Sequence, residues 1–193
     1  MKTLFSSLLA VSGLFLLTGC PSDGGGAGDF GEGGTGTIVY LADQDINGVF
    51  ELYRATSGTK VSQTLGVGRS VTSFSITPDR TAVIYIADQD TLGVFELYRV
   101  NLSTPGVSTK LHTTLSGGRD VTSFTIAPDG GSVVYVADQD TDEAFELYRT
   151  VLGTLTNTKL NAALGFGEDV ADLRIIPDSS GGVYRADQDT DTI

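Results

Sequence analysis

The sequence has few of the residues on which disulfide-bonded folds, metal centres and histidine-based catalysis depend. Its 193 residues include one cysteine, one histidine, one methionine and no tryptophan. Because Cys20 stands alone, no disulfide can form within one chain, and the fold must be held by packing. His112 has no second histidine beside which to ligate a metal, and no G-x-S-x-G string supplies a nucleophile. We therefore expect a protein that is not an enzyme.

Basic residues are also scarce. Twelve Lys and Arg stand against 24 Asp and Glu, which gives a formal net charge of −12. A negative field repels phosphate backbones, and the basic residues are scattered along the chain, so we expect no binding to nucleic acid. For the same reason, we expect no electrostatic attraction between the chain and anionic lipid headgroups.

The only long apolar run lies at the N-terminus. Residues 4–17 follow Lys2 and have the character of a secretory signal, although they are too short for a comfortable membrane span. The string that follows, LTGC at 17–20, resembles the lipobox of bacterial lipoproteins. The resemblance implies removal of residues 1–19, a diacylglycerol on the Cys20 thiol, and a place in the bacterial cell envelope, periplasmic or surface-exposed. An ordinary secretory peptide with an incidental cysteine is the alternative.

Residues 20–36 are predicted to be a flexible tether between this lipid and a folded body. The stretch is rich in glycine, and Phe30 is its only large apolar side chain. Such a composition cannot bury enough surface to order itself. The folded part is then expected at residues 37–193.

A repeat runs through residues 37–193. Three segments are nearly the same, at 39–54, 84–99 and 134–149, and a fourth begins at Val183. The first aspartate of each ADQD string is Asp43, Asp88, Asp138 or Asp187, so the period is 45 to 50 residues. We expect the repeats to lie at about 37–65, 66–115, 116–164 and 165–193.

Within one period, apolar residues alternate in short runs. In the third period we expect strands at 121–128, 132–138 and 145–152, with a fourth at 156–161. Four short strands every 45 to 50 residues are typical of β-propeller blades. Counting strands predicts an all-β chain of four-stranded antiparallel blades, about three to three and a half in number, which forms an open or incomplete propeller with edges available for self-association.

The pattern of Ile-x-Pro-Asp-Gly, then Val-Val-Tyr-x-Ala-Asp, then Glu-Leu-Tyr resembles the repeat of TolB-type propellers, which are related to WD-like repeats. It covers essentially all of residues 37–193. The resemblance implies a periplasmic or surface-exposed protein that grips protein partners on the faces of its propeller. It does not say which partner.

The acidic loops can be interpreted in two ways. Asp43, Asp45, Asn47 and Glu51 have the oxygen-ligand spacing of a calcium loop. The later copies depart from that spacing, with Leu92 at the fifth position of the second. The structural alternative has the aspartates bonding turn amides, with carboxylate–arginine pairs between blades that involve Arg69 and Arg119, and with Glu51, Glu96 and Glu146 in an inter-blade hydrogen-bonding set.

Three functions remain open. The first is a membrane-anchored envelope lipoprotein whose propeller binds or scaffolds an envelope protein or a glycan, and the membrane itself is a partner through Cys20. The second is an adhesion or structural protein that binds calcium through the DQD loops. The third is a carbohydrate-active enzyme, since paired carboxylates are abundant, although their repetition favours architecture.

Overall fold

The computed structural model describes residues 37–115, 117–162, 164 and 167–187, and the regular structure there is all β-strand. No helix within these ranges is long and apolar enough to cross a membrane. The predicted signal, the lipidation of Cys20 and the tether at 20–36 lie outside the described residues.

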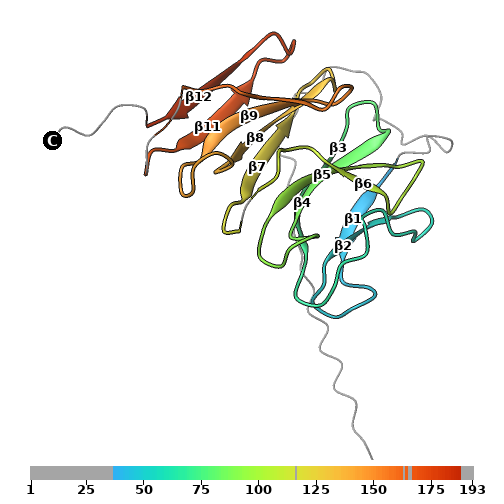
Figure 1. The fold of residues 1–193 in the computed structure, drawn as a ribbon. Helices are drawn as coiled ribbons and strands as arrows, with labels where there is room; N and C mark the ends of the chain where they lie inside the picture. Colours follow the sequence, from blue (N-terminus) through green and yellow to red (C-terminus); the bar gives the residue numbers. More distant parts are fainter. Residues whose placement is uncertain (1–36, 116, 163, 165–166, 188–193) are drawn as a thin grey trace, which may run out of the picture. The chain divides into compact units, whose positions relative to one another are not determined.

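Twelve strands form four antiparallel sheets, which we call blades 1 to 4 (Figure 1). Blade 1 has β1 (Val39–Ala42) and β2 (Glu51–Arg54). Blade 2 has β3 (Val71–Ile76), β4 (Ala82–Ala87), β5 (Glu96–Asn101) and β6 (Ser108–Lys110). Blade 3 has β7 (Val121–Ile126), β8 (Ser132–Ala137), β9 (Glu146–Val151) and β10 (Thr156–Lys159). Blade 4 has β11 (Val170–Ile175) and β12 (Gly182–Ala186).

The fold class predicted from the sequence is confirmed. The two middle blades have four strands in sequential order, and the outer two are incomplete. Within the described residues, blade 1 has no first strand, and the bridge between Tyr53 and Lys60 marks the place of its fourth. The part of blade 4 that the structure describes consists of its first two strands. In the described residues, β1 pairs only with β2 and β12 only with β11, so the propeller is incomplete.

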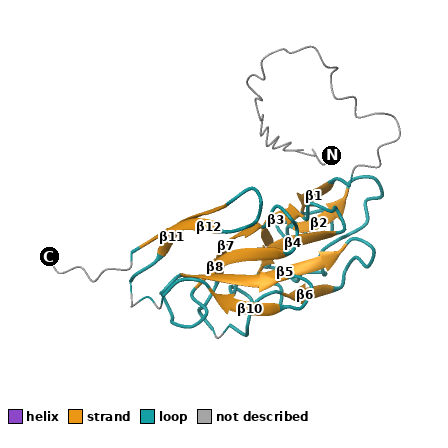
Figure 2. Cartoon of the chain, turned by 90° about the horizontal axis from the view of Figure 1, so that it is seen from above, coloured by secondary structure: helices purple, strands orange, loops and turns teal. Residues whose placement is uncertain are grey.

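The second strand of each middle blade is buried on both faces. Every residue of β4 and β8 is buried, as expected for a strand between two neighbouring sheets. The faces of blades 1 to 3 meet in two apolar clusters built from mostly equivalent positions of the repeat, one between blades 1 and 2 and one between blades 2 and 3. Figure 2 shows the blades following one another in chain order from β1 to β12.

A Pro-Asp turn joins the first two strands of blades 2 to 4. Its aspartate accepts a hydrogen bond from the amide two residues on, at 3.1 Å for Asp79 and 2.9 Å for Asp129. The residue after the aspartate has a positive φ, 70° at Gly130 and 58° at Arg80. Glycine adopts this left-handed conformation without strain. Where another residue stands there, as Arg80 does, the hydrogen bond to the aspartate still stabilises the turn.

Candidate functional site

The first aspartate of the first three ADQD loops closes its own loop, and in the second and third copies it also ties the loop to the connection from the preceding blade. Asp88 Oδ2 accepts from the amide of Gly93 at 3.1 Å, and Asp88 Oδ1 accepts from the amide of Ser70 at 2.8 Å. Asp138 does the same with Glu143 and Asp120. Asp43 Oδ2 accepts from Gly48 at 3.1 Å. The structural interpretation of these aspartates, which has them bonding turn amides, is confirmed.

In the first loop, the second aspartate, Asp45, and the repeated glutamate, Glu51, both form an ion pair with the same lysine, Lys60. Lys60 Nζ lies 2.7 Å from Asp45 Oδ2 and 2.6 Å from Glu51 Oε2. Burial opposes the charged form of Lys60, but the bonds to Asp45 and Glu51 raise its pKa above the ordinary value. One ammonium group therefore compensates two carboxylates.

The same cluster is built in all three copies. Lys110 Nζ is 2.9 Å from Asp90 and 2.7 Å from Glu96. Lys159 Nζ is 2.8 Å from an oxygen of Asp140 and 2.8 Å from one of Glu146. These three lysines were not predicted from the sequence. Their signal is a Thr-Lys pair before an apolar residue, at 59–61, 109–111 and 158–160.

A tyrosine two residues after each glutamate completes the cluster. The hydroxyl of Tyr53 donates to Glu51 at 3.0 Å, and the hydroxyl of Tyr148 donates to Glu146 at 2.9 Å. Burial and the adjacent carboxylate raise the pKa of Tyr53 to about 12. Because the glutamate, tyrosine and lysine all belong to one blade, the prediction of an inter-blade set was wrong. The set fixes the third strand to the fourth within each blade.

The predicted calcium ligands do not gather at one point. Asp45 and Glu51 are brought together, but Lys60 lies between them, and Glu51 is buried with 1% of its surface exposed. Asp43 bonds an amide of its own loop, and Asn47 is exposed. Within the ranges that the structure covers, no group of three or more His, Cys, Asp or Glu residues could hold a metal ion. The calcium site stays a prediction, and an ion there would have to displace Lys60.

Other side chains join one blade to the next. Gln89 accepts from Tyr85 at 2.6 Å and donates to Gln63 of blade 1 at 3.2 Å. Arg69 donates to the backbone carbonyl of Gln89 at 2.5 Å, and Arg119 donates to that of Gln139 at 3.0 Å. The prediction that Arg69 and Arg119 pair with carboxylates between blades is therefore wrong. Both guanidinium groups donate to backbone carbonyl oxygens at the ends of the loops instead.

His112 stands at a position where blades 1 and 3 have a side chain that accepts a hydrogen bond from an amide of the third strand. In blades 1 and 3, Ser62 Oγ and Asn161 Oδ1 accept from the amides of Leu52 and Leu147. The ring of His112 bonds the carbonyl of Thr113 instead, and its buried Nε2 has no hydrogen-bond partner among the residues that the structure describes. Burial lowers the pKa of His112. A buried neutral ring in the body of a blade is a packing residue.

No protein-family model matches the sequence, and no curated protein matches it significantly. Solved structures do match. TolB from Acinetobacter baumannii has a TM-score of 0.51 and 18% sequence identity, over 77% of this chain and 34% of that one. The described residues form a TolB-like propeller. The chain spans about a third of the length of that TolB structure, so the likeness shows the fold alone.

Two further structures have lower TM-scores. A candidate TolB from Agrobacterium tumefaciens gives 0.43 at 20% identity, over 69% of this chain and 54% of that one. A puromycin-hydrolysing peptidase from Mycobacterium tuberculosis gives 0.45 at 12% identity, over 70% and 24% of the two chains. Neither of these two likenesses carries an argument.

Proposed function

We propose that this chain is a lipid-anchored protein of the bacterial cell envelope, periplasmic or surface-exposed, whose TolB-like propeller binds or scaffolds a protein partner. One observation carries the proposal. The carboxylates that recur in the first three repeats have the same internal partners each time, an amide for the first aspartate and a lysine for the glutamate. Carboxylates that make the same internal contacts in three copies stabilise the blades themselves, so we assign recognition of a partner to the outer surfaces.

The internal partners also weigh against a glycosidase. A pair of catalytic carboxylates needs one acid that is protonated and can reach a leaving group. Glu96 is buried and contacts Lys110 and Tyr98, and Glu146 is buried in the same way. Each glutamate is thus enclosed by its own blade. We accordingly propose a non-enzymatic role.

The lipid anchor is supported by the LTGC string at 17–20. If Cys20 is lipidated, the expressed full-length chain should label with a palmitate analogue and partition into the detergent phase. Cys20→Ser should lose the label and be released or left unprocessed. Unchanged membrane partitioning of Cys20→Ser would contradict the anchor.

The binding role is tested by capture. The full-length chain, purified in mild detergent, serves as bait for an envelope extract, and captured proteins are identified by mass spectrometry and then purified for direct binding measurements. We expect a stoichiometric protein partner. A polysaccharide screen run in parallel separates a glycan partner, and hydrolysis of any polysaccharide in that screen would overturn the non-enzymatic role.

A further inference from the structure

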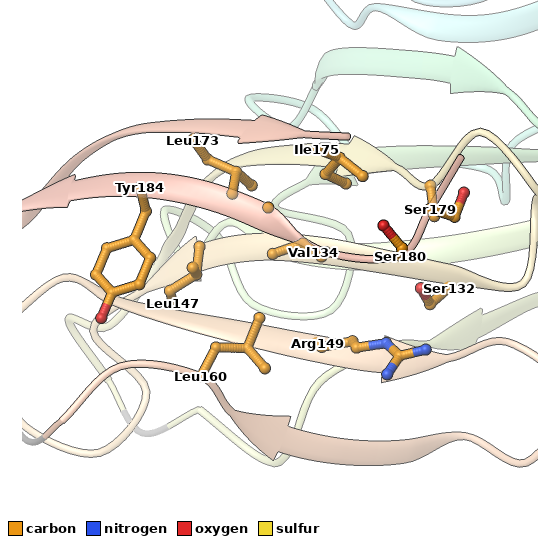
Figure 3. A pocket seen from close by; sticks show the side chains of 13 residues that line it. Ser132, Val134, Leu147, Arg149, Leu160, Leu173, Ile175, Ser179, Ser180 and Tyr184 are labelled. Atoms are coloured by element: carbon orange, nitrogen blue, oxygen red, sulfur yellow. The ribbon is translucent and has the colours of Figure 1, made fainter. Parts of the chain in front are cut away.

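The first strands of blades 2 to 4 present their apolar side chains to the preceding blade. In β3 and β7 the residues that pack against the cluster on that side are Phe74, Ile76, Phe124 and Ile126. Figure 3 shows the same arrangement in blade 4, where Leu173 and Ile175 of β11 lie on the side that faces Val134 of blade 3. Because side chains alternate along a strand, Ser73 and Ser75 of β3 face the following blade, blade 3.

A groove of about 500 Å³ lies between β3 and β7. One wall carries the hydroxyl side chains of Ser73 and Ser75 from blade 2, and the other carries the apolar side chains of Phe124 and Ile126 from blade 3. The ring of Pro78 stands at one end, where the Pro-Asp turn begins. The structure describes all four strands of both blades, so blades 2 and 3 build the groove by themselves. Its volume is in the range of small-molecule sites, roughly 300–1,000 Å³.

The hydroxyl groups of this groove are free to bind a ligand. Ser73 and Ser75 are exposed, and neither side chain makes a hydrogen bond to another described residue. The equivalent residues are Ser123 and Thr125 in β7, and Asp172 and Arg174 in β11. A blade therefore folds with charged side chains at these two positions, and the hydroxyl groups of blade 2 are not required by the fold.

The lining limits the chemistry of the ligand. No Asp, Glu, Lys, Arg or His is among the described residues that line the groove, so an ionic ligand would lose water without gaining a counter-charge. A purely apolar ligand would cover Ser73 and Ser75 and leave their hydroxyl groups without a hydrogen-bond partner. A peptide added as a strand would need pockets for alternate side chains, which a wall of two serines does not supply. The ligand that fits is uncharged and has both hydroxyl groups and an apolar face.

We propose that the groove between β3 and β7 binds a neutral oligosaccharide. A pyranose ring has hydroxyl groups around its rim and C–H groups on its faces. It can therefore bond Ser73 and Ser75 on one wall while one of its faces lies against the ring of Phe124 on the other. An aromatic ring has a negative face, which attracts C–H groups polarised by neighbouring oxygens. This site adds a ligand to the propeller and does not depend on the protein partner proposed above.

Isothermal titration calorimetry on the full-length protein tests the site, in a detergent that has no sugar headgroup. The probes are maltotriose, cellotriose and triacetylchitotriose, and trigalacturonate is the charged control. We expect saturable binding of at least one neutral trisaccharide and no binding of trigalacturonate. Ser75→Val should weaken that binding by about threefold to tenfold, because it removes one hydrogen bond. Ser75→Phe fills the groove and should abolish binding.

Thr109→Val is the matched control, because Thr109 is an exposed hydroxyl residue of β6 outside the groove, and it should leave binding unchanged. Melting followed by circular dichroism shows whether each variant folds, and Ser75→Val, which alters one exposed side chain, serves if Ser75→Phe does not fold. Absence of binding by all three neutral trisaccharides, or equal binding by Ser75→Phe and the wild type, would overturn the site. Tighter binding of trigalacturonate would do the same. A captured protein whose binding Ser75→Phe abolishes, and with which no trisaccharide competes, would assign the groove to a protein and overturn the saccharide site while supporting the proposed binding function.

Discussion

Lys159→Met should destabilise the propeller by about 3 kcal/mol, because it leaves a buried carboxylate without its cation. Lys159 Nζ lies 2.9 and 2.8 Å from the two oxygens of Glu146, whose side chain is 1% exposed. Without the ammonium group, the partners that Glu146 keeps among the described residues are the Tyr148 hydroxyl and the Leu164 amide. Breaking a buried pair costs about 3–5 kcal/mol, and the 27% exposure of Lys159 places this one at the lower end.

The loss is measured by thermal and urea unfolding followed by circular dichroism. At roughly 2–4 °C per kcal/mol, Tm should fall by about 6–12 °C. Asp140→Asn is the matched control, since it removes the half-exposed acid on the same lysine and should cost no more than about 1 kcal/mol. Adding Glu146→Leu to Lys159→Met should recover part of the loss. A Lys159→Met protein as stable as Asp140→Asn would refute the compensation of Glu146 by Lys159.

Three further predictions concern pH and metal. His112→Asn should raise the free energy of unfolding at neutral pH by about 1 kcal/mol, since asparagine can accept a hydrogen bond from the third-strand amide as Asn161 does. Because burial lowers the pKa of His112, protonation of the ring should cost the wild type stability as pH falls below about 6.5, and the variant should not show this loss. Burial raises the pKa of Tyr85 and Tyr135 to about 12, so these two phenols stay protonated longer in the folded state, and stability should fall as pH rises from about 10 to 12. Their own phenolate absorbance at 295 nm, taken as the difference between the wild type and Tyr85→Phe or Tyr135→Phe, should appear only with unfolding, and such a difference near pH 10 in the folded protein would contradict this. Melting curves in millimolar calcium and in chelator should coincide, since Lys60 already compensates Asp45 and Glu51, and a calcium-dependent rise in Tm that Asp45→Asn abolishes would establish the metal site.

The strand count and the order of the strands could be predicted because the sequence repeats. The runs expected at 121–128, 132–138 and 145–152 correspond to β7, β8 and β9, each within two residues at either end. Even the short fourth strand was placed at β10. Period-two alternation and Pro-Asp turns are local signals, and three copies of each remove the ambiguity of a single one.

Side-chain partners could not be predicted to the same degree. Glu51 and Lys60 are nine residues apart, whereas Glu96 and Lys110 are fourteen apart, because the hairpin between the third and fourth strands varies in length. Variable spacing conceals a pair that only the strand register brings together. The spacing of the predicted calcium ligands is likewise a pattern along the chain. It does not show that Lys60, from the fourth-strand position, lies against two of those ligands.

In a repeat protein, a residue that recurs in each copy is needed by the copy, and a residue that departs from the repeat marks where the surroundings differ. The tyrosine, glutamate and lysine of blades 1 to 3 are of the first kind, and they bind one another within their own blade. Arg185 is of the second kind, because it stands where the inner blades have Ile86 and Val136. Leu160 keeps the apolar residue of its position but is 43% exposed, whereas Val61 and Leu111 are buried. Because Arg185 and Leu160 both depart from the pattern of the inner blades, the surroundings of both faces of blade 4 differ from those of blades 2 and 3.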